Sequence, residues 1–203
     1  PAAELYNVPS DYILEIGLTP NRADAASHIG VARDIKAIKN RDIRWPAVDQ
    51  FRTENRNLPI TVVVENPEAC IRYSGLTIAG VTVAESPAWL KNRLLSVGLT
   101  PINNIVDITN FVCFEIGQPL HAFDADQITG RKVLVKTLPA GSTFVTLDNK
   151  ERKLQGSDLM ICNVEEGMCI AGVFGGSKSG ITTGTKSIFL ESACFSPDYV
   201  RKT

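Results

Sequence analysis

The sequence predicts an α+β fold in which a mostly antiparallel, mixed β-sheet carries few packed helices and follows a small helical segment. Two observations lead to this class. Stretches typical of strands follow one another over residues 132–192, and helical patterns are confined to the part before them. Segregated strands and helices indicate α+β, whereas regular alternation would indicate a parallel sheet. With 44% hydrophobic and 21% charged residues, the 203-residue chain is expected to form a real core.

The first 45 residues predict a short strand and one helix. Residues 12–16 alternate in the manner of a strand, and Thr19-Pro20-Asn21 then opens a helix. Asn21 is expected to cap that helix, with Asp24 near its positive N-terminus. His28 lies off the apolar stripe and is interpreted as a surface histidine. The stripe recurs at helical spacing and comprises Ala25, Ile29, Ala32, Ile35 and Ile38.

A polar, irregular stretch then predicts a linker over residues 46–59. Strands are expected over Ile60–Glu65 and Arg72–Val83. Ser86-Pro87 is typical of a helix start, and Gly98 suits the residue after a helix end. The segment between them is therefore expected to be a helix that buries Leu90, Leu94 and Val97.

A second helix is predicted over Asn104–Ile116. Its apolar stripe would be Ile105, Ile108, Val112 and Ile116, while Thr109 and Asn110 lie on another, polar face. Gly117 ends the helix, and Pro119 prevents its continuation. Residues 117–124 are expected to form a loop that returns His121, one of two histidines, alongside the polar face.

The remainder predicts strands joined by turns. Asp148-Asn149 marks a turn, and residues 175–180 form a glycine-rich loop that lacks the spacing of a phosphate-binding loop. The expected strands are Lys132–Thr137, Thr143–Leu147, Leu159–Asn163, Cys169–Val173 and Ser187–Ser192.

Composition excludes several classes of protein. The net charge of −1 gives no global attraction to nucleic acid, so any nucleic acid must be held mainly by something else or touched at a small point. No apolar run approaches the roughly 20 residues that span a bilayer, so no membrane partner is expected. The chain begins at Pro1 rather than Met, and we expect it to be an excised piece of a longer protein.

Five cysteines lack the spacing of a disulfide framework or a zinc site. They are interpreted as buried thiols in a reducing cytoplasm, and no metal site is expected. They are Cys70, Cys113, Cys162, Cys169 and Cys194.

Three segments carry candidate functional groups. Thr109, Asn110 and His121 form the first, the glycine-rich run 171–176 the second, and Glu191 the third. His121 is either a proton carrier or a structural histidine, and the glycines either admit a ligand or form a tight turn. Glu191 interrupts an apolar strand, so it either meets a buried partner or lies on the outward face of an edge strand. These residues alone predict a small-molecule pocket.

Four segments closely resemble the β subunit of bacterial phenylalanyl-tRNA synthetase and occur in the family's order. The resemblance implies that residues 1–45 belong to the B1 module, that 46–59 are a linker, and that 60–203 form the B3/B4 editing domain, cut short at its C-terminal end. The segments are LEIGLTPNRADAASHIGVARDI (14–35), PINNIVDITNFVCFEIGQPLHAFD (101–124), AGVFGG (171–176) and FLESACFSP (189–197).

The resemblance also implies a function. Members of the family are cytoplasmic tetramers of two α and two β subunits that charge tRNA(Phe) with phenylalanine, using ATP and Mg²⁺ at a site in the α subunit. The B3/B4 domain takes the tRNA 3′ end and hydrolyses tyrosine that is wrongly attached to it, without a metal. Carried over by motif, the catalytic residues are Thr109, Asn110 and His121, and the substrate-binding residues are Gly172, Gly175, Glu191 and Ala193.

The chemistry of the residues agrees with this expectation. A buried carboxylate can select the tyrosine hydroxyl, because a hydrogen bond to a charged group is worth roughly 1.5–3 kcal/mol. Glu191 is the expected reader of that hydroxyl. His121 is expected to position water or the ester rather than act as a strict general base. Two alternatives are a non-catalytic tRNA-binding or assembly module and a ligand-binding domain that shares the fold.

Overall fold

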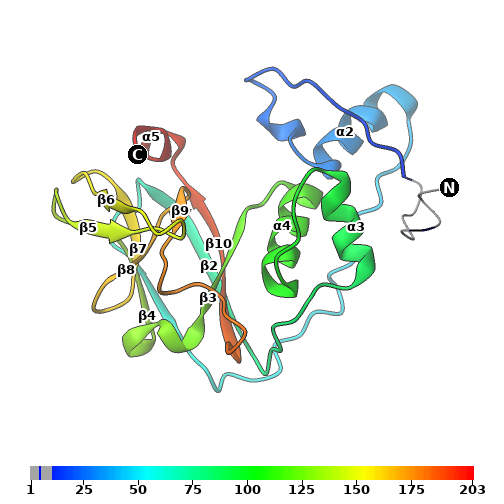
Figure 1. Cartoon of the computed structure of the whole chain (residues 1–203). Coiled ribbons are helices and arrows are strands. Elements are labelled where there is room, and N and C mark those ends of the chain that lie inside the picture. Colours follow the sequence, from blue (N-terminus) through cyan, green and yellow to red (C-terminus); the bar gives the residue numbers. More distant parts are fainter. Residues whose placement is uncertain (1–4, 6–10) are drawn as a thin grey trace. The chain divides into compact units, whose positions relative to one another are not determined.

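The computed structural model describes residue 5 and residues 11–203, and the chain divides into two compact units. Unit 1 comprises Pro1–Phe51 and Ala84–Pro119, and unit 2 comprises Arg52–Val83 and Leu120–Thr203. Unit 1 carries the long helices and unit 2 the sheets (Figure 1). The predicted first module begins in residues 1–4 and 6–10, which lie outside the described residues, and the predicted module boundaries stay a prediction.

Helix α4 of unit 1 (Asn104–Ile116) has the bounds that the sequence predicts. The side chain of Asn103 accepts hydrogen bonds from the backbone N–H groups of Ile105 and Val106, which satisfies two donors of the first turn. Gly117 adopts a left-handed conformation with φ of 79° and donates its N–H to the Cys113 carbonyl. Both ends of α4 are therefore fixed by local chemistry.

The first helix begins later than predicted. Residues 23–25 form a 3₁₀ turn, η1 (Ala23–Ala25), and α2 (His28–Lys39) starts after Ser27, whose side chain accepts from the Gly30 N–H. Asn21 does not cap a helix and instead accepts the Thr19 hydroxyl at 2.6 Å. The strand predicted over residues 12–16 is also wrong, because that segment is exposed and forms no strand in the described part of the chain.

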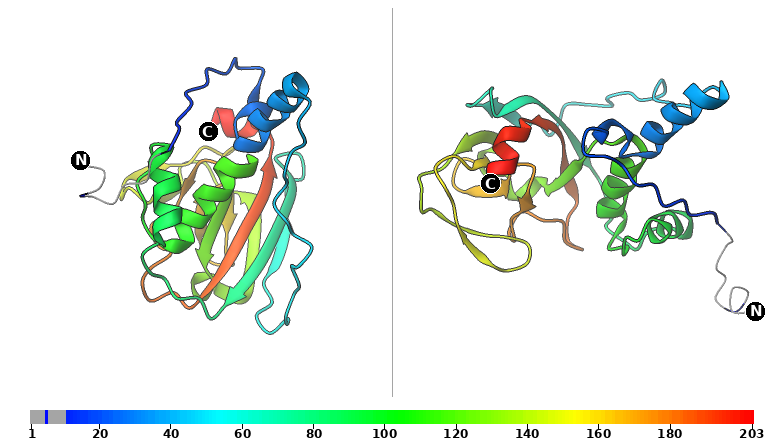
Figure 2. Two further views of the ribbon diagram at one scale, coloured as in Figure 1. Left: turned by 90° about the vertical axis from the view of Figure 1, so that its right-hand side faces the viewer. Right: turned by 90° about the horizontal axis from the view of Figure 1, so that it is seen from above.

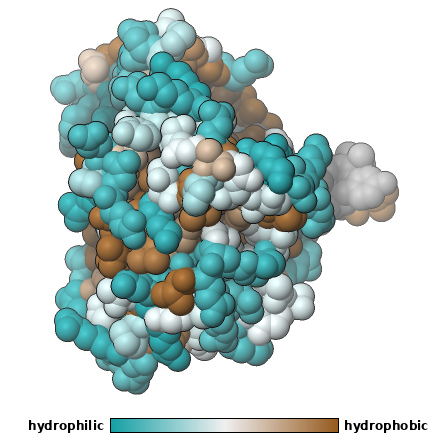
Figure 3. All heavy atoms as spheres, turned by 90° about the vertical axis from the view of Figure 1, so that its left-hand side faces the viewer, coloured by the Kyte–Doolittle hydropathy of each residue, from teal (hydrophilic) through white to brown (hydrophobic). Residues whose placement is uncertain are grey.

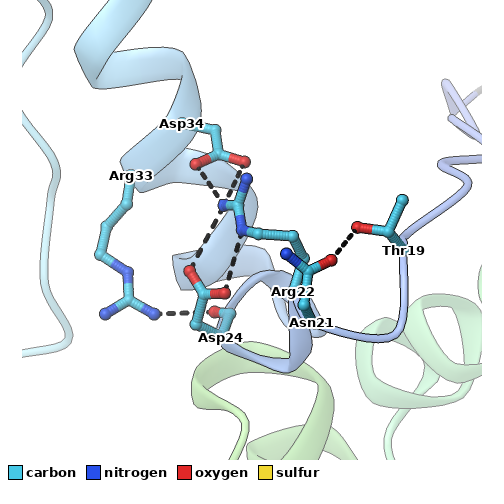
Figure 4. A network of polar contacts seen from close by, with 6 residues as sticks. All are labelled: Thr19, Asn21, Arg22, Asp24, Arg33 and Asp34. Atoms are coloured by element: carbon cyan, nitrogen blue, oxygen red, sulfur yellow. Dashed lines mark hydrogen bonds and ion pairs between the residues drawn. The ribbon is translucent and has the colours of Figure 1, made fainter.

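A network of polar contacts joins η1 to α2 (Figure 4). The Arg22 guanidinium donates to both oxygens of Asp34, at 2.8 and 2.9 Å, and to those of Asp24, at 3.1 and 3.3 Å. Arg33 donates to the Asp24 carbonyl at 2.7 Å. Gly30 permits this close approach, since a Cβ there would lie 2.3 Å from the same carbonyl oxygen.

The buried face of the unit 1 helices differs from the predicted stripes. Four isoleucines that were predicted to lie in the buried stripes are exposed: Ile35, Ile38, Ile108 and Ile116. Helix α3 (Ala88–Ser96) does bury Leu90 and Leu94, as expected.

Asp107 of α4 is fully buried. Its carboxylate accepts the Ser86 hydroxyl at 2.5 Å and the Ile102 N–H at 2.9 Å. The pattern of apolar residues does not reveal this buried face of α4, because a hydrogen-bonded carboxylate occupies it in place of an apolar side chain.

Unit 2 contains three sheets. The five-stranded sheet has the order β1-β4-β7-β8-β9, in which β1 pairs with β4 in parallel and the other pairs are antiparallel. The three-stranded sheet has the order β2-β10-β3 and is antiparallel, and β5 and β6 form a hairpin. This mixed, mostly antiparallel arrangement confirms the predicted fold class. The bounds are β1 Thr61–Val64, β2 Cys70–Ala79, β3 Leu120–Asp124, β4 Lys132–Thr137, β5 Thr143–Val145, β6 Glu151–Lys153, β7 Leu159–Cys162, β8 Gly167–Ile170, β9 Phe174–Gly175 and β10 Ser187–Phe195.

The core of unit 2 lies between the five-stranded and three-stranded sheets. Val133 and Val135 of β4 pack in one cluster with Phe123 of β3 and Phe189 of β10. Strand β7 is buried on both faces, because its Met160 and Cys162 join a second cluster with Phe144 of the β5 hairpin. Figure 2 shows β10 running beside β2 in the three-stranded sheet.

Several elements are absent from the prediction. Residues 120–124 form strand β3 instead of a loop. The strand predicted over Cys169–Val173 ends at Ile170, and Gly175, predicted to lie in a loop, belongs to β9. Strand β6, helix α5 (Pro197–Lys202) and the 3₁₀ turns η2 (Ala125–Gln127) and η3 (Thr129–Arg131) are additional. Cys194 is exposed, contrary to the expectation of a buried thiol, because alternation along β10 places it on the face opposite to Glu191 and Ala193.

The surface of unit 2 is mixed. Val145 and Leu147 are 40% and 49% exposed. Figure 3 shows the side of the molecule that lies on the left in Figure 1, where several small groups of hydrophobic residues lie among hydrophilic ones. No helix among the described residues is long and apolar enough to cross a membrane.

Candidate functional site

Strand register brings two predicted site residues together. Glu191 of β10 pairs with His121 of β3 on one side and with Gly75 of β2 on the other. Directly opposed residues of an antiparallel pair project to the same face, with Cβ atoms about 5 Å apart. The carboxylate and the imidazole are therefore neighbours on one face of the three-stranded sheet.

This face looks into the core of unit 2. Phe123 and Phe189, each two residues from a member of the pair along its strand, are 0% and 1% exposed. Glu191 itself is only 5% exposed, and β10 is the central strand of its sheet. The alternative of an outward-facing residue on an edge strand is thus excluded.

The Glu191 carboxylate has a neutral partner. The Tyr73 hydroxyl of β2 donates to its Oε2 at 3.1 Å. Burial disfavours the charged form and raises the pKa of Glu191 to about 7, although the bond from Tyr73 acts in the opposite direction. The same environment raises the pKa of the Tyr73 hydroxyl well above its usual range, mainly through burial and secondarily through the adjacent carboxylate. Tyr73 is therefore always a donor here.

His121 is uncharged at neutral pH. Burial lowers its pKa to about 4, and its ring meets the Phe123 ring edge-on, with centroids 4.5 Å apart. A neutral imidazole donates through one nitrogen and accepts through the other. His121 can therefore orient water or a carbonyl, but it is a weak base.

Gly175 lies against the imidazole. It belongs to β9, at the edge of the five-stranded sheet, and a Cβ there would lie 3.1 Å from His121 Cε1 and 2.8 Å from Leu147 Cδ1. Gly175 therefore lies in a strand rather than a tight turn and allows close approach of the imidazole, while its contact with a ligand stays a prediction.

The two other predicted substrate-binding residues occupy different places. Ala193 pairs with Tyr73 and shares the face of Glu191. Gly172 has a positive φ of 70°, and a Cβ there would lie 3.1 Å from the Phe195 ring and 3.2 Å from Val200. Gly172 therefore supports the end of β10 and α5.

Thr109 and Asn110 belong to α4 in unit 1, whereas His121 and Glu191 belong to unit 2. Thr109 is buried, and its hydroxyl donates to the Val106 carbonyl at 2.7 Å within the helix. Asn110 is half-buried. Because these residues and His121 belong to different units, their joint action stays a prediction.

Sequence reasoning missed Tyr73. It is separated from Glu191 by 118 positions, so no local spacing links them. The available signal was indirect, because a carboxylate in a buried strand needs a hydrogen-bond partner and a tyrosine in a neighbouring strand can supply one.

A cavity of about 150 Å³ lies elsewhere in unit 2. The predicted site residues do not line it. Two of its buried polar side chains serve the backbone, since Asn163 donates to the Gln127 carbonyl and Ser179 to the Met168 carbonyl. No group of three or more metal-ligating side chains is present in the described ranges.

The family model of the B3/4 domain matches residues 69–203, which include all seven predicted site residues. The chain belongs to the B3/4 domain family. Both strands that carry Glu191 and His121 lie inside this B3/4 domain, and so does Tyr73.

Relatives of this B3/4 protein are phenylalanine–tRNA ligase β subunits. That of Bacteroides fragilis (strain ATCC 25285) is 59% identical over 207 residues, covering 100% of this chain and 25% of the relative. That of Porphyromonas gingivalis is 54% identical over 209 residues, with the same coverage. That of Carboxydothermus hydrogenoformans is 42% identical over 193 residues, covering 95% and 24%. The chain spans about a quarter of the length of these relatives, and the predicted resemblance is confirmed.

A solved structure shares the fold. The crystal structure of an N-terminal fragment of the phenylalanyl-tRNA synthetase β subunit from Pyrococcus horikoshii superposes with a TM-score of 0.51 at 15% identity. The match covers 88% of this chain and 54% of that one. The likeness supports the B3/4 fold alone.

Proposed function

We propose that this B3/4 domain hydrolyses tyrosine wrongly attached to tRNA(Phe), as the editing part of a phenylalanine–tRNA ligase β subunit. One observation carries the proposal: a buried carboxylate, Glu191, lies in register beside a neutral histidine, His121. Among the described residues, the neutral hydroxyl of Tyr73 is the hydrogen-bonding partner of Glu191. A carboxylate accepts several hydrogen bonds, so it retains capacity for a substrate hydroxyl.

The arrangement supports selection of tyrosine over phenylalanine. The two amino acids differ by one hydroxyl, and a bond from it to a charged acceptor is worth roughly 1.5–3 kcal/mol. Phenylalanine would in addition leave a buried carboxylate without that bond. Sites built in this way reject the analogue lacking the hydroxyl by roughly 10⁴–10⁵.

His121 is proposed to position the attacking water or the ester. A pKa of about 4 makes the imidazole too weak a base to draw a proton efficiently from water near pH 7. An aminoacyl ester is already reactive, so orientation contributes most of what the site must supply. Thr109 and Asn110 are proposed to assist at the ester, and Gly175 and Ala193 to leave room for the tyrosyl ring. The space beside Gly172 is instead filled by Phe195 and Val200.

The intact protein is proposed to act as its relatives' names describe. It would join an α subunit in a tetramer of two α and two β subunits and charge tRNA(Phe) with phenylalanine in the cytoplasm. ATP and Mg²⁺ would bind at a synthetic site outside this chain, and the tRNA 3′ end would reach the B3/4 domain.

The test is deacylation of purified Tyr-tRNA(Phe) by the tetrameric enzyme. Glu191→Ala is expected to lower the rate by about 10- to 150-fold, the range that corresponds to the lost hydrogen bond, and to leave phenylalanine charging intact. Glu151→Ala, in the exposed β6 strand, is the matched control and should behave as the wild type.

Unchanged deacylation by Glu191→Ala would remove Glu191 as the reader of the hydroxyl. If the wild-type enzyme hydrolyses neither Tyr-tRNA nor Phe-tRNA, the domain is instead a non-catalytic module for tRNA binding or assembly.

A further inference from the structure

Tyr73 is held firmly beside Glu191. Tyr73 pairs with Ala193 of β10. This pair is the next one along the same face of the sheet after the pair of Gly75 and Glu191. The ring of Tyr73 stacks on that of Phe189, with centroids 6.5 Å apart and planes inclined by 14°. The hydroxyl therefore reaches the carboxylate from a ring whose orientation is fixed by packing.

Gly75 makes this stacking possible. A Cβ on Gly75 would lie 2.2 Å from Cζ and 2.5 Å from Cε2 of Phe189, so the phenylalanine ring occupies the space above the glycine. The position directly opposite Glu191 on β2 thus offers no side chain. The hydroxyl of Tyr73, two residues before Gly75 on β2, donates the hydrogen bond to Glu191 instead.

The other titratable groups around Glu191 are uncharged near pH 7. Burial raises the pKa of the Cys70 thiol of β2 to about 11 and that of Cys169 of β8 further still, with the Glu191 charge adding to both. His121 of β3 is neutral because burial lowers its pKa. The Tyr73 hydroxyl is therefore the group in this shell that stabilises the ionised carboxylate.

We propose that Tyr73 is a positioning residue that fixes Oε2 of Glu191 and favours the ionised carboxylate, leaving Oε1 to accept the phenol of a tyrosyl ester. This inference rests on the proposed editing function. A fixed, ionised carboxylate discriminates better than a free one, since the acceptor is already oriented before the substrate arrives.

The test is the pH profile of the Tyr73→Phe tetramer. Rates of Tyr-tRNA and Phe-tRNA deacylation are measured from pH 6 to 9, with the enzyme-free hydrolysis subtracted. Loss of a hydrogen bond to the ionised form raises the pKa of Glu191, so Tyr-tRNA deacylation is expected to fall at pH 7 and to recover at higher pH. A rise of about one unit from about 7 lowers the ionised fraction at pH 7 from about one half to about one tenth, a loss of about fivefold, while phenylalanine charging is unchanged.

Tyr199→Phe is the matched control, because Tyr199 packs against the same core and loses the same atom. Glu191→Gln should abolish the pH dependence, and adding Tyr73→Phe to it should change nothing more. A Tyr73→Phe profile that superposes on the wild type, or that falls equally at every pH, would overturn the inference.

Failure of the proposed function gives a different result. In that case the wild-type enzyme hydrolyses no Tyr-tRNA at any pH. If wild type and Glu191→Gln behave as expected and only Tyr73→Phe does not, the editing function stands and the role of Tyr73 is refuted. Infrared titration of the Glu191 carboxylate gives an independent readout, with its midpoint expected at higher pH in Tyr73→Phe.

Discussion

Gly175 sets the distance between strand β9 and the imidazole of His121. Its Cα is so close that an added methyl group would lie 3.1 Å from the ring and 2.8 Å from Leu147. The His121 ring also has Phe123 at its side, which limits the directions in which it can move. The orientation of the histidine therefore depends on the absence of a side chain in a neighbouring sheet.

Gly175→Ala is expected to displace the imidazole and to lower Tyr-tRNA deacylation by up to about 100-fold, the cost of a misplacement of about 1 Å. Deacylation rates and the thermal midpoint of the tetramer check this. Gly156→Ala is the control, since its Cβ would meet only Ala140 at 3.7 Å, an ordinary contact. Equal rates for the two variants would show that the imidazole does not depend on Gly175.

Residue identity was predictable only where the chemistry was local. Glu191 stands out in the sequence because a carboxylate interrupts an apolar strand, and the hydrogen bond from Tyr73 confirms that it meets a buried partner. Tyr73 could not be found in this way, since the bond that defines it crosses a sheet. The role of Gly172 at the end of β10 was likewise hidden, because Phe195 and Val200 are its neighbours only in space.

At the scale of elements, α4 shows how local caps define a helix. Asn103→Ala removes the acceptor for two backbone N–H groups of the first turn. The expected loss of stability is about 1 kcal/mol, measured by urea unfolding of the chain. Asn103→Ser keeps an acceptor at the same position and should retain most of the stability. A loss of the same size in both variants would contradict the capping role.

Elements with strong local signals were predicted well. Helix α4 and strand β4 have the predicted bounds, since glycine, capping residues and alternation mark them. Strand β3 was taken for a loop, because Gly117 and Pro119 suggest irregular structure and its strand character depends on pairing with β10. The start of α2 was misplaced because Ser27 caps it in preference to Asn21.

At the scale of the whole molecule, the two site residues act on stability in opposite directions. The pKa of Glu191 is raised from 4.5 to about 7, so the stability it contributes is present below pH 4.5 and is lost as the pH rises through 7. The pKa of His121 is lowered from 6.5 to about 4, so its contribution is present above pH 6.5 and is lost as the pH falls through 4. Each shift corresponds to roughly 3 kcal/mol.

The two contributions nearly cancel between pH 4 and 7, and single variants should expose them. The free energy of unfolding of Glu191→Gln, relative to that of wild type, is expected to rise by roughly 3 kcal/mol as the pH rises from 4.5 to 7. The free energy of unfolding of His121→Gln, relative to that of wild type, is expected to rise by a similar amount as the pH falls from 6.5 to 4. Urea unfolding across this range measures both differences, and a pH-independent difference in either variant would show that the group does not titrate as described.

The position of β10 has a consequence for synthesis of the protein. It follows every other described strand in chain order, yet it is the central strand between β2 and β3. Because a chain leaves the ribosome N-terminus first, β2 and β3 emerge with their edges unpaired and wait for residues 187–195. Tyr73 and His121 are therefore made long before they can flank Glu191, and a nascent chain halted before Ser187 has no site at all.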